Sequence, residues 1–293
     1  MKHYLLVLIL SFCLLRTAAA QTQVPFALVS ANRGWAGLDA APADNALSVA
    51  GATPYADGSE PSLLPPPALP RMAPELALQA FQTRAARQAA ELVSYSATTV
   101  VRAELPGTAQ RGEFELRRMY NAPRTLLFKA IRFSGDNFVK GNVITRLLQA
   151  EVDHVQKDDS ASTAISPANY KFSFKGTSQL ESRVVHVYQL KPREKRPGLF
   201  RGRIYLDAHT GSLVRAEGSA VKSPSFFIRK IEFVQDYGDF DSFTFPVHMH
   251  SEAKARLVGK AVVDIYHRDY RSVANTVQSA RAVIVSPIVI STE

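Results

Sequence analysis

The sequence is almost free of cysteine: the only one among 293 residues is Cys13, which stands inside an apolar run near the N-terminus. Once that segment is removed, no thiol remains, so disulfides, thiolate zinc sites and cysteine nucleophiles are excluded. Long hydrophobic runs are also missing. The run from Leu5 to Leu15 covers only about half of a bilayer core, and we expect no transmembrane anchor.

Short catalytic motifs are missing as well, since the sequence has no G-x-S-x-G elbow, no H-E-x-x-H and no G-x-x-x-x-G-K-[ST] phosphate loop. His248 and His250 are two residues apart on one predicted strand, with Asp264, His267 and Asp269 further on. Spacing fixes no third ligand, so we expect no metal site. We likewise expect no catalytic residue and no cofactor, and therefore not an enzyme.

The N-terminus is typical of a secretory signal peptide. Lys2 and His3 precede the apolar run, and Arg16 and three alanines ending at Ala20 follow it. We therefore assign residues 1–20 to a cleaved signal peptide and expect a periplasmic protein. Residues 21–73 form a flexible arm rich in proline and alanine, residues 74–285 form the folded domain, and residues 286–293 form a C-terminal tail.

Positive charge is concentrated in one segment of this chain, whose formal net charge is +9. Between Lys191 and Arg203 there are six basic residues and a single acidic one, Glu194. Nucleic-acid binders spread cations over a face, so we expect no nucleic acid. Instead, we expect this segment to contact an anionic membrane surface, a lipid headgroup or an envelope protein. The residues concerned are Lys191, Arg193, Lys195, Arg196, Leu199, Phe200, Arg201 and Arg203. The alternative is a solvated hairpin in which Leu199 and Phe200 begin the next strand.

Two helices are predicted. The first begins at Pro74 and carries one apolar stripe of Leu78, Phe81, Ala85 and Leu92. The second runs from about 142 to 156, with Asn142 as its N-cap and one face made of Ile144, Leu147, Leu148, Glu151 and Val155. We expect Glu151, Asp153 and His154 to be solvated.

Elsewhere the apolar residues alternate with a period of two, which indicates antiparallel strands with one buried face. Tyr170, Phe172 and Phe174 alternate with polar residues, and a second alternation runs from Phe243 to Met249. Residues 204–207 and 213–215 flank a short loop containing Gly211, which predicts a hairpin. The pattern predicts an α+β fold, in which about ten or eleven strands form a strongly curved antiparallel sheet, an incomplete β-barrel, with covering helices.

The order of these elements resembles the periplasmic LolA, LolB and RseB superfamily. The hairpin of residues 207–215 and the stretches 191–202 and 221–227 are similar to motifs of its "outer membrane lipoprotein-sorting protein" group. The resemblance covers about residues 75–272. It implies an incomplete barrel that encloses an apolar cavity under helices and binds acylated proteins or lipid-like ligands.

On this resemblance, we expect a carrier or chaperone whose partner is a lipid or an acylated lipoprotein. The candidate cavity lining is the apolar set Leu78, Phe81, Phe128, Phe172, Phe174, Ile204 and Leu206. Two alternatives stay open: an RseB-like sensor or scaffold that binds an envelope protein, and an envelope-lipid hydrolase assembled from distant residues.

Overall fold

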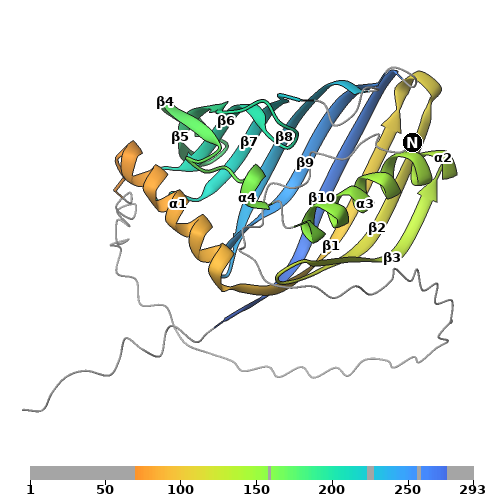
Figure 1. The fold of residues 1–293 in the computed structure, drawn as a ribbon, viewed down its shortest axis with the longest axis horizontal. Helices are drawn as coiled ribbons and strands as arrows, with labels where there is room; N and C mark the ends of the chain where they lie inside the picture. Colours follow the sequence, from red (N-terminus) through yellow and green to blue (C-terminus); the bar gives the residue numbers. More distant parts are fainter. Residues whose placement is uncertain (1–69, 158–159, 223–227, 256–258, 276–293) are drawn as a thin grey trace, which may run out of the picture. The chain divides into compact units, whose positions relative to one another are not determined.

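The computed structural model describes residues 70–157, 160–222, 228–255 and 259–275 (Figure 1). Its first half consists of α1 (Pro74–Glu91), β1 (Leu92–Leu105), the short helix η1 (Pro106–Thr108), β2 (Gln110–Asn121), β3 (Thr125–Gly135), α2 (Asn137–Val139), the π-helical turn η2 (Lys140–Ile144), α3 (Thr145–Gln156) and α4 (Ser160–Thr163). The second half consists of β4 (Tyr170–Leu180), β5 (Arg183–Pro192), β6 (Phe200–Asp207), β7 (Leu213–Ala220), β8 (Ile228–Phe240), β9 (Phe243–Ala255) and β10 (Gly259–Ala274).

All ten strands belong to one antiparallel sheet in the order β3-β2-β1-β10-β9-β8-β7-β6-β5-β4. β3 and β4 are the two ends of this order, so the sheet does not close. The segment that connects them carries α2, η2, α3 and α4 across the curved sheet (Figure 1). The structure confirms the predicted α+β fold with an incomplete barrel and covering helices.

The strand register lines up one row of side chains across the whole sheet. From β3 to β4 this row is Phe133, Phe114, Val101, Ile265, Met249, Gln235, Ala216, Ile204, Tyr188 and Phe174. The eight inner members are buried, and Gln235 is the only polar residue in the row. Because side chains alternate between the faces of a strand, this row marks a continuous apolar face, called here the concave face.

Helix α1 covers one part of this face. It begins at Pro74, as predicted, and buries Ala77 and Phe81. The turn between β6 and β7 approaches it so closely that a Cβ on Gly211 would lie 2.6 Å from the Cβ of Ala80. Gly211 also has a φ of +69°, which confirms the glycine predicted for this hairpin. Leu92, expected on the helix, is the first residue of β1.

The second predicted helix begins earlier than expected. Gly135 ends β3 with a φ of +108°, and the Asp136 amide bonds to the carbonyl of Arg111, so the chain leaves the sheet there and becomes helical at Asn137. The prediction that Asn142 is the N-cap is therefore wrong. Asn142 lies within the helical segment, and its side chain donates to the carbonyl of Phe138 at 3.2 Å.

The expected signal peptide, most of the arm and the C-terminal tail lie outside the described residues. Residues 70–73, which we expected in the arm, contact the sheet: the Met72 amide donates to the carbonyl of Ala208 at 2.7 Å. Within the described part of the chain, no helix has the length and apolar character needed to cross a membrane.

Candidate functional site

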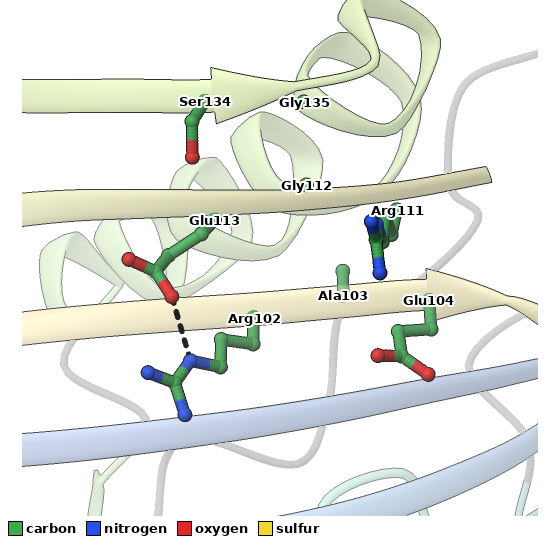
Figure 2. Close-up of a pocket in the computed structure, with 8 residues that line it drawn as sticks. All are labelled: Arg102, Ala103, Glu104, Arg111, Gly112, Glu113, Ser134 and Gly135. Atoms are coloured by element: carbon green, nitrogen blue, oxygen red, sulfur yellow. Dashed lines mark hydrogen bonds and ion pairs between the residues drawn. The ribbon is translucent and has the colours of Figure 1, made fainter.

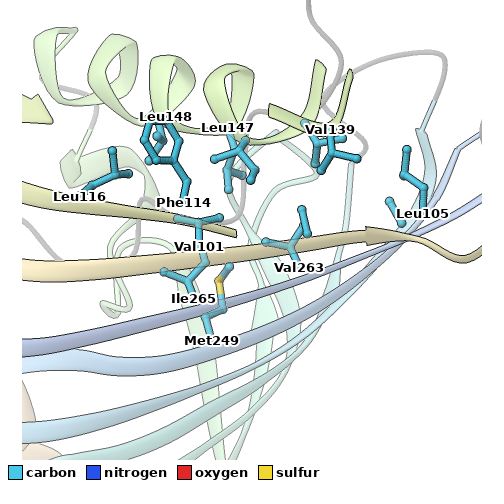
Figure 3. Packing of buried hydrophobic residues seen from close by; sticks show 14 residues of the cluster. Val101, Leu105, Phe114, Leu116, Val139, Leu147, Leu148, Met249, Val263 and Ile265 are labelled. Atoms are coloured by element: carbon cyan, nitrogen blue, oxygen red, sulfur yellow. The ribbon is translucent and has the colours of Figure 1, made fainter. Parts of the chain in front are cut away.

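Helix α3 and the turn η2 lie over the concave face at β1, β2, β9 and β10 and are called the lid here. Figure 3 shows Leu147 and Leu148 pointing from α3 toward the sheet, where Val101, Phe114 and Ile265 point back. All five side chains are at most 9% exposed. The lid therefore fills this part of the concave face with its own apolar side chains.

The described residues enclose only a small crevice under the lid. A crevice of about 10 Å³ lies there, lined by Leu147, Ile231, Met249, Ser251, Ala253, Ala261 and Val263. That volume is close to what one water molecule needs, whereas pockets for small molecules usually hold about 300–1,000 Å³. An acyl chain can enter this region, called here the trough, only if the lid moves away from the sheet.

A buried ion pair joins the lid to the sheet. The guanidinium of Arg118 on β2 contacts the carboxylate of Glu151 on α3, and the two side chains are only 8% and 3% exposed. The Nε of Arg118 also donates to the Tyr95 hydroxyl at 2.8 Å. Its guanidinium lies over the rings of Tyr95 and Phe128, 5.7 and 5.5 Å from their centroids. Arg118 is thus held on the sheet, while its countercharge belongs to the lid.

The charge state of this cluster follows from its burial and its neighbours. Burial opposes the charge on Arg118, but Glu151 and Tyr95 outweigh it and hold the pKa of Arg118 above its ordinary value. Nearby, the Nδ1 of His267 is 2.9 Å from the Thr99 hydroxyl. Burial, together with the positive charge of Arg118, lowers the pKa of His267 to about 3. His267 is therefore neutral near pH 7, and this pKa makes it a weak general base.

The segment that follows the lid along the chain is hydrogen-bonded to the basic segment. Between α3 and β4, the side chain of buried Asn169 donates to the carbonyls of Ala161 and Ala164, both at 2.9 Å. Arg196 donates to the Oδ1 of Asn169 at 2.5 Å, and Arg193 donates to the carbonyl of Pro167 at 2.7 Å. Two of the six cations therefore hold the segment that follows the lid.

The predicted cavity residues fall into different environments. Phe81, Ile204 and Leu206 are buried in one cluster between α1 and β4–β8, and Leu78 and Phe172 pack against it. Phe174, on the end strand β4, is 43% exposed. Phe128 alone lies by the lid, beneath Arg118. The set thus splits between the α1 side and the lid side of the concave face, and five of its members belong to the cluster that α1 forms with the sheet.

The basic segment also divides. Leu199 and Phe200 are each 1% exposed and pack in the core, with Phe200 as the first residue of β6. They are not available to insert into a membrane. The cations Lys191, Arg193, Lys195, Arg201 and Arg203 are exposed. What this segment presents to solvent is charge without an apolar pair.

The histidines expected on one strand lie on the opposite, outer face. His248 Nε2 and His250 Nδ1 both contact one oxygen of Asp264, at 3.2 and 2.9 Å. No group of three or more His, Cys, Asp or Glu side chains among the described residues is arranged to hold a metal ion. The outer face also has a polar hollow of about 470 Å³, where Arg102 pairs with Glu113 at 2.7 Å (Figure 2).

Sequence reasoning missed the pair Arg118 and Glu151, and the prediction that Glu151 is solvated is wrong. Two local signals could have found it. Arg118 shares the inward phase of β2 with Phe114 and Leu116, and Glu151 shares the apolar face of α3 with Leu147 and Leu148. A basic and an acidic residue, each on an apolar face, indicate a buried ion pair.

No protein-family model and no curated protein matches the sequence. A LolA superfamily protein from Nitrosomonas europaea is 10% identical with a TM-score of 0.34, and the match covers 67% of this chain and 92% of that chain. An outer membrane lipoprotein-sorting protein domain from Vibrio parahaemolyticus is 14% identical with a TM-score of 0.35, and the match covers 68% of this chain and 92% of that chain. A chain of the complex of MucA and MucB from Pseudomonas aeruginosa is 11% identical with a TM-score of 0.24, and the match covers 68% of this chain and 98% of that chain. The first is a member of the LolA superfamily, and the second is a lipoprotein-sorting domain, the group whose motifs the sequence resembles. At these TM-scores, nothing about this chain's ligand follows from the likeness.

Proposed function

We propose that this protein is a periplasmic carrier or chaperone that holds an acyl chain of a lipid or lipoprotein in the trough beneath the lid. The observation that supports this most strongly is the way the lid is held. An amphipathic helix covers an apolar face, and its ionic link to the sheet is a single buried pair, Arg118 with Glu151, among the described residues. A permanent core helix does not need a buried ion pair, because apolar side chains would hold it without the desolvation cost of two charges.

The lid and an acyl chain would each bury a similar amount of apolar surface on the sheet. Lifting the lid exposes five buried apolar side chains, at about 2 kcal/mol each: Val143, Ile144, Leu147, Leu148 and Val152. An acyl chain with about 14 buried methylene groups gains on the order of 11 kcal/mol before the costs of association. The apolar burial that the lid loses and the apolar burial that an acyl chain gains are thus of similar size.

Native mass spectrometry tests this function. The mature chain is purified gently from its own envelope fraction, and anything bound is extracted with organic solvent. We expect a lipid or an acylated peptide in stoichiometric amount. A protein that is empty, and that after refolding has no affinity for acyl probes, would contradict the proposal.

A second function, docking to an envelope protein, is favoured by the basic segment, whose exposed cations include Lys191, Lys195 and Arg201. Reversing these three charges should abolish capture of such a partner and leave uptake of lipid unchanged. Arg193 and Arg196 are unsuitable for this test because they hold the segment after the lid. Unchanged capture by the charge-reversed chain would argue against docking through this segment.

A further inference from the structure

We infer that the ligand of the trough is an amphiphile with an acidic headgroup, a carboxylate or a phosphate monoester, which replaces Glu151 on Arg118 when the lid lifts. This inference rests on the proposed function and adds the chemical class of the ligand. Three observations support it: an unpaired oxygen of Glu151, the lack of a second carboxylate at Arg118, and the position of Arg118 beside the trough.

The first observation is an incompletely satisfied acid. One oxygen of Glu151 contacts Arg118, while the other, Oε2, is buried and has no hydrogen-bond partner among the described residues. Unpaired buried carboxylate oxygens are costly, so this acid is a poor permanent partner. An anion that can use the planar fork of the guanidinium with two oxygens is a better one.

The second observation is the absence of a substitute anion. Among the described residues, Glu151 is the only carboxylate in contact with Arg118. The Nε of Arg118 donates to the hydroxyl of Tyr95, which is not a carboxylate, and nearby His267 is neutral near pH 7 because burial lowers its pKa to about 3. When Glu151 leaves with the lid, the cation stays on the concave face without a countercharge. A ligand that enters this space therefore gains if it supplies the anion itself.

The third observation is the position of the cation beside the trough. Leu147 lies over the crevice and Glu151 over Arg118, and the two are four residues apart on α3. Four residues are about one turn, or roughly 6 Å along the helix axis. One movement of the lid therefore exposes both an apolar trough and a cation at its side. This combination fits an acyl chain with an acidic head and leaves a neutral head unpaired.

Equilibrium binding of three amphiphiles with the same chain tests the inference. Dodecyl phosphate, dodecanoate and 1-dodecanol are each titrated, at about pH 8, against the full mature chain preloaded with the uncharged fluorophore Nile red. We expect both anions to bind at least about tenfold more tightly than the alcohol. Tighter binding of the phosphate than of the carboxylate indicates a phosphate monoester head, and the reverse order indicates a free fatty acid.

Two double variants provide the matched comparison. R118L/E151L removes the buried pair without leaving a charge behind, and all three amphiphiles should then bind within about threefold of one another. R102L/E113L removes an arginine–glutamate pair between β1 and β2 on the outer face and should keep the preference for anions. Should R118L/E151L not fold, E151Q serves instead, because weakening the competing acid should increase the ratio of anion to alcohol affinity.

The outcomes separate the two proposals. Equal binding of the anions and the alcohol by the wild-type chain, or a preference that survives in R118L/E151L, overturns the inference and leaves the acyl-binding function standing. An unchanged or smaller ratio in E151Q overturns it as well. If none of the three amphiphiles displaces Nile red, the proposed function fails, and the inference fails with it.

Discussion

Removing one partner of the pair between Arg118 and Glu151 should destabilise the protein far more than removing both. The side chains are 8% and 3% exposed, so solvent screens neither charge effectively. Loss of one partner from a buried pair costs about 3–5 kcal/mol, because the other charge stays buried without compensation. We expect this loss in the free energy of unfolding for both R118L and E151L. The double variant R118L/E151L should lie within about 1 kcal/mol of wild type or above it.

Urea unfolding at neutral pH, followed by far-ultraviolet circular dichroism, measures the four free energies and the coupling between the two positions. Hydrogen exchange of the amides in α3 shows whether each single variant opens the lid before the whole sheet unfolds. The control cycle R102L/E113L, on an exposed pair, should be close to additive. If the two buried single variants each lose less than about 1 kcal/mol and add up to the double variant, the pair does not hold the lid.

Three further predictions concern the same unit. The pKa of His267 falls from 6.5 to about 3 on folding. Between these pH values His267 is protonated in the unfolded chain and neutral in the folded chain. Stability should thus fall by up to about 1.4 kcal/mol per pH unit as the pH drops below about 6.5. H267Q should have a shallower slope between about pH 7 and pH 5 in urea unfolding, and equal slopes would contradict the assignment. G135A should lose more than about 1 kcal/mol, because φ is +108° and its Cβ would lie 2.4 Å from the carbonyl oxygen of Arg111. Its control, G141A, meets nothing within 4 Å and should be neutral or stabilising in thermal melts. G211A should destabilise the contact with α1, visible as faster exchange of the helix amides, and unchanged exchange would argue against that contact.

Much of the fold could be predicted from local patterns. The period-two alternation around Phe172 and Phe245 places side chains on opposite faces, and Pro74 and Gly211 mark a helix start and a turn through their own backbone preferences. The sequence also predicts the number of strands closely, because each strand is bounded by turn residues. These features depend only on neighbours along the chain, which a sequence displays directly.

The features that define the site depend on contacts between distant residues. Thr99 and His267 are 168 positions apart and meet because β10 pairs with β1. Arg118 and Glu151 meet because the chain crosses from β3 over the concave face before it reaches β4. Alternation also does not tell which part of a face a helix covers. The predicted lining therefore fell mainly in the cluster that α1 forms with the sheet, whereas the trough lies under α3.

The central claim is that an acyl chain occupies the trough beneath the lid, and photolabelling tests it most directly. The mature chain is equilibrated with a dodecanoic acid that carries a diazirine on its chain, irradiated, digested and mapped by tandem mass spectrometry, with unlabelled dodecanoate as competitor. We predict competable labelling on residues that line the crevice, such as Leu147 on the lid and Met249 and Val263 on the concave face. Labelling confined to the outer face, for example at His248 or Tyr266, or labelling that the competitor does not reduce, would contradict the claim.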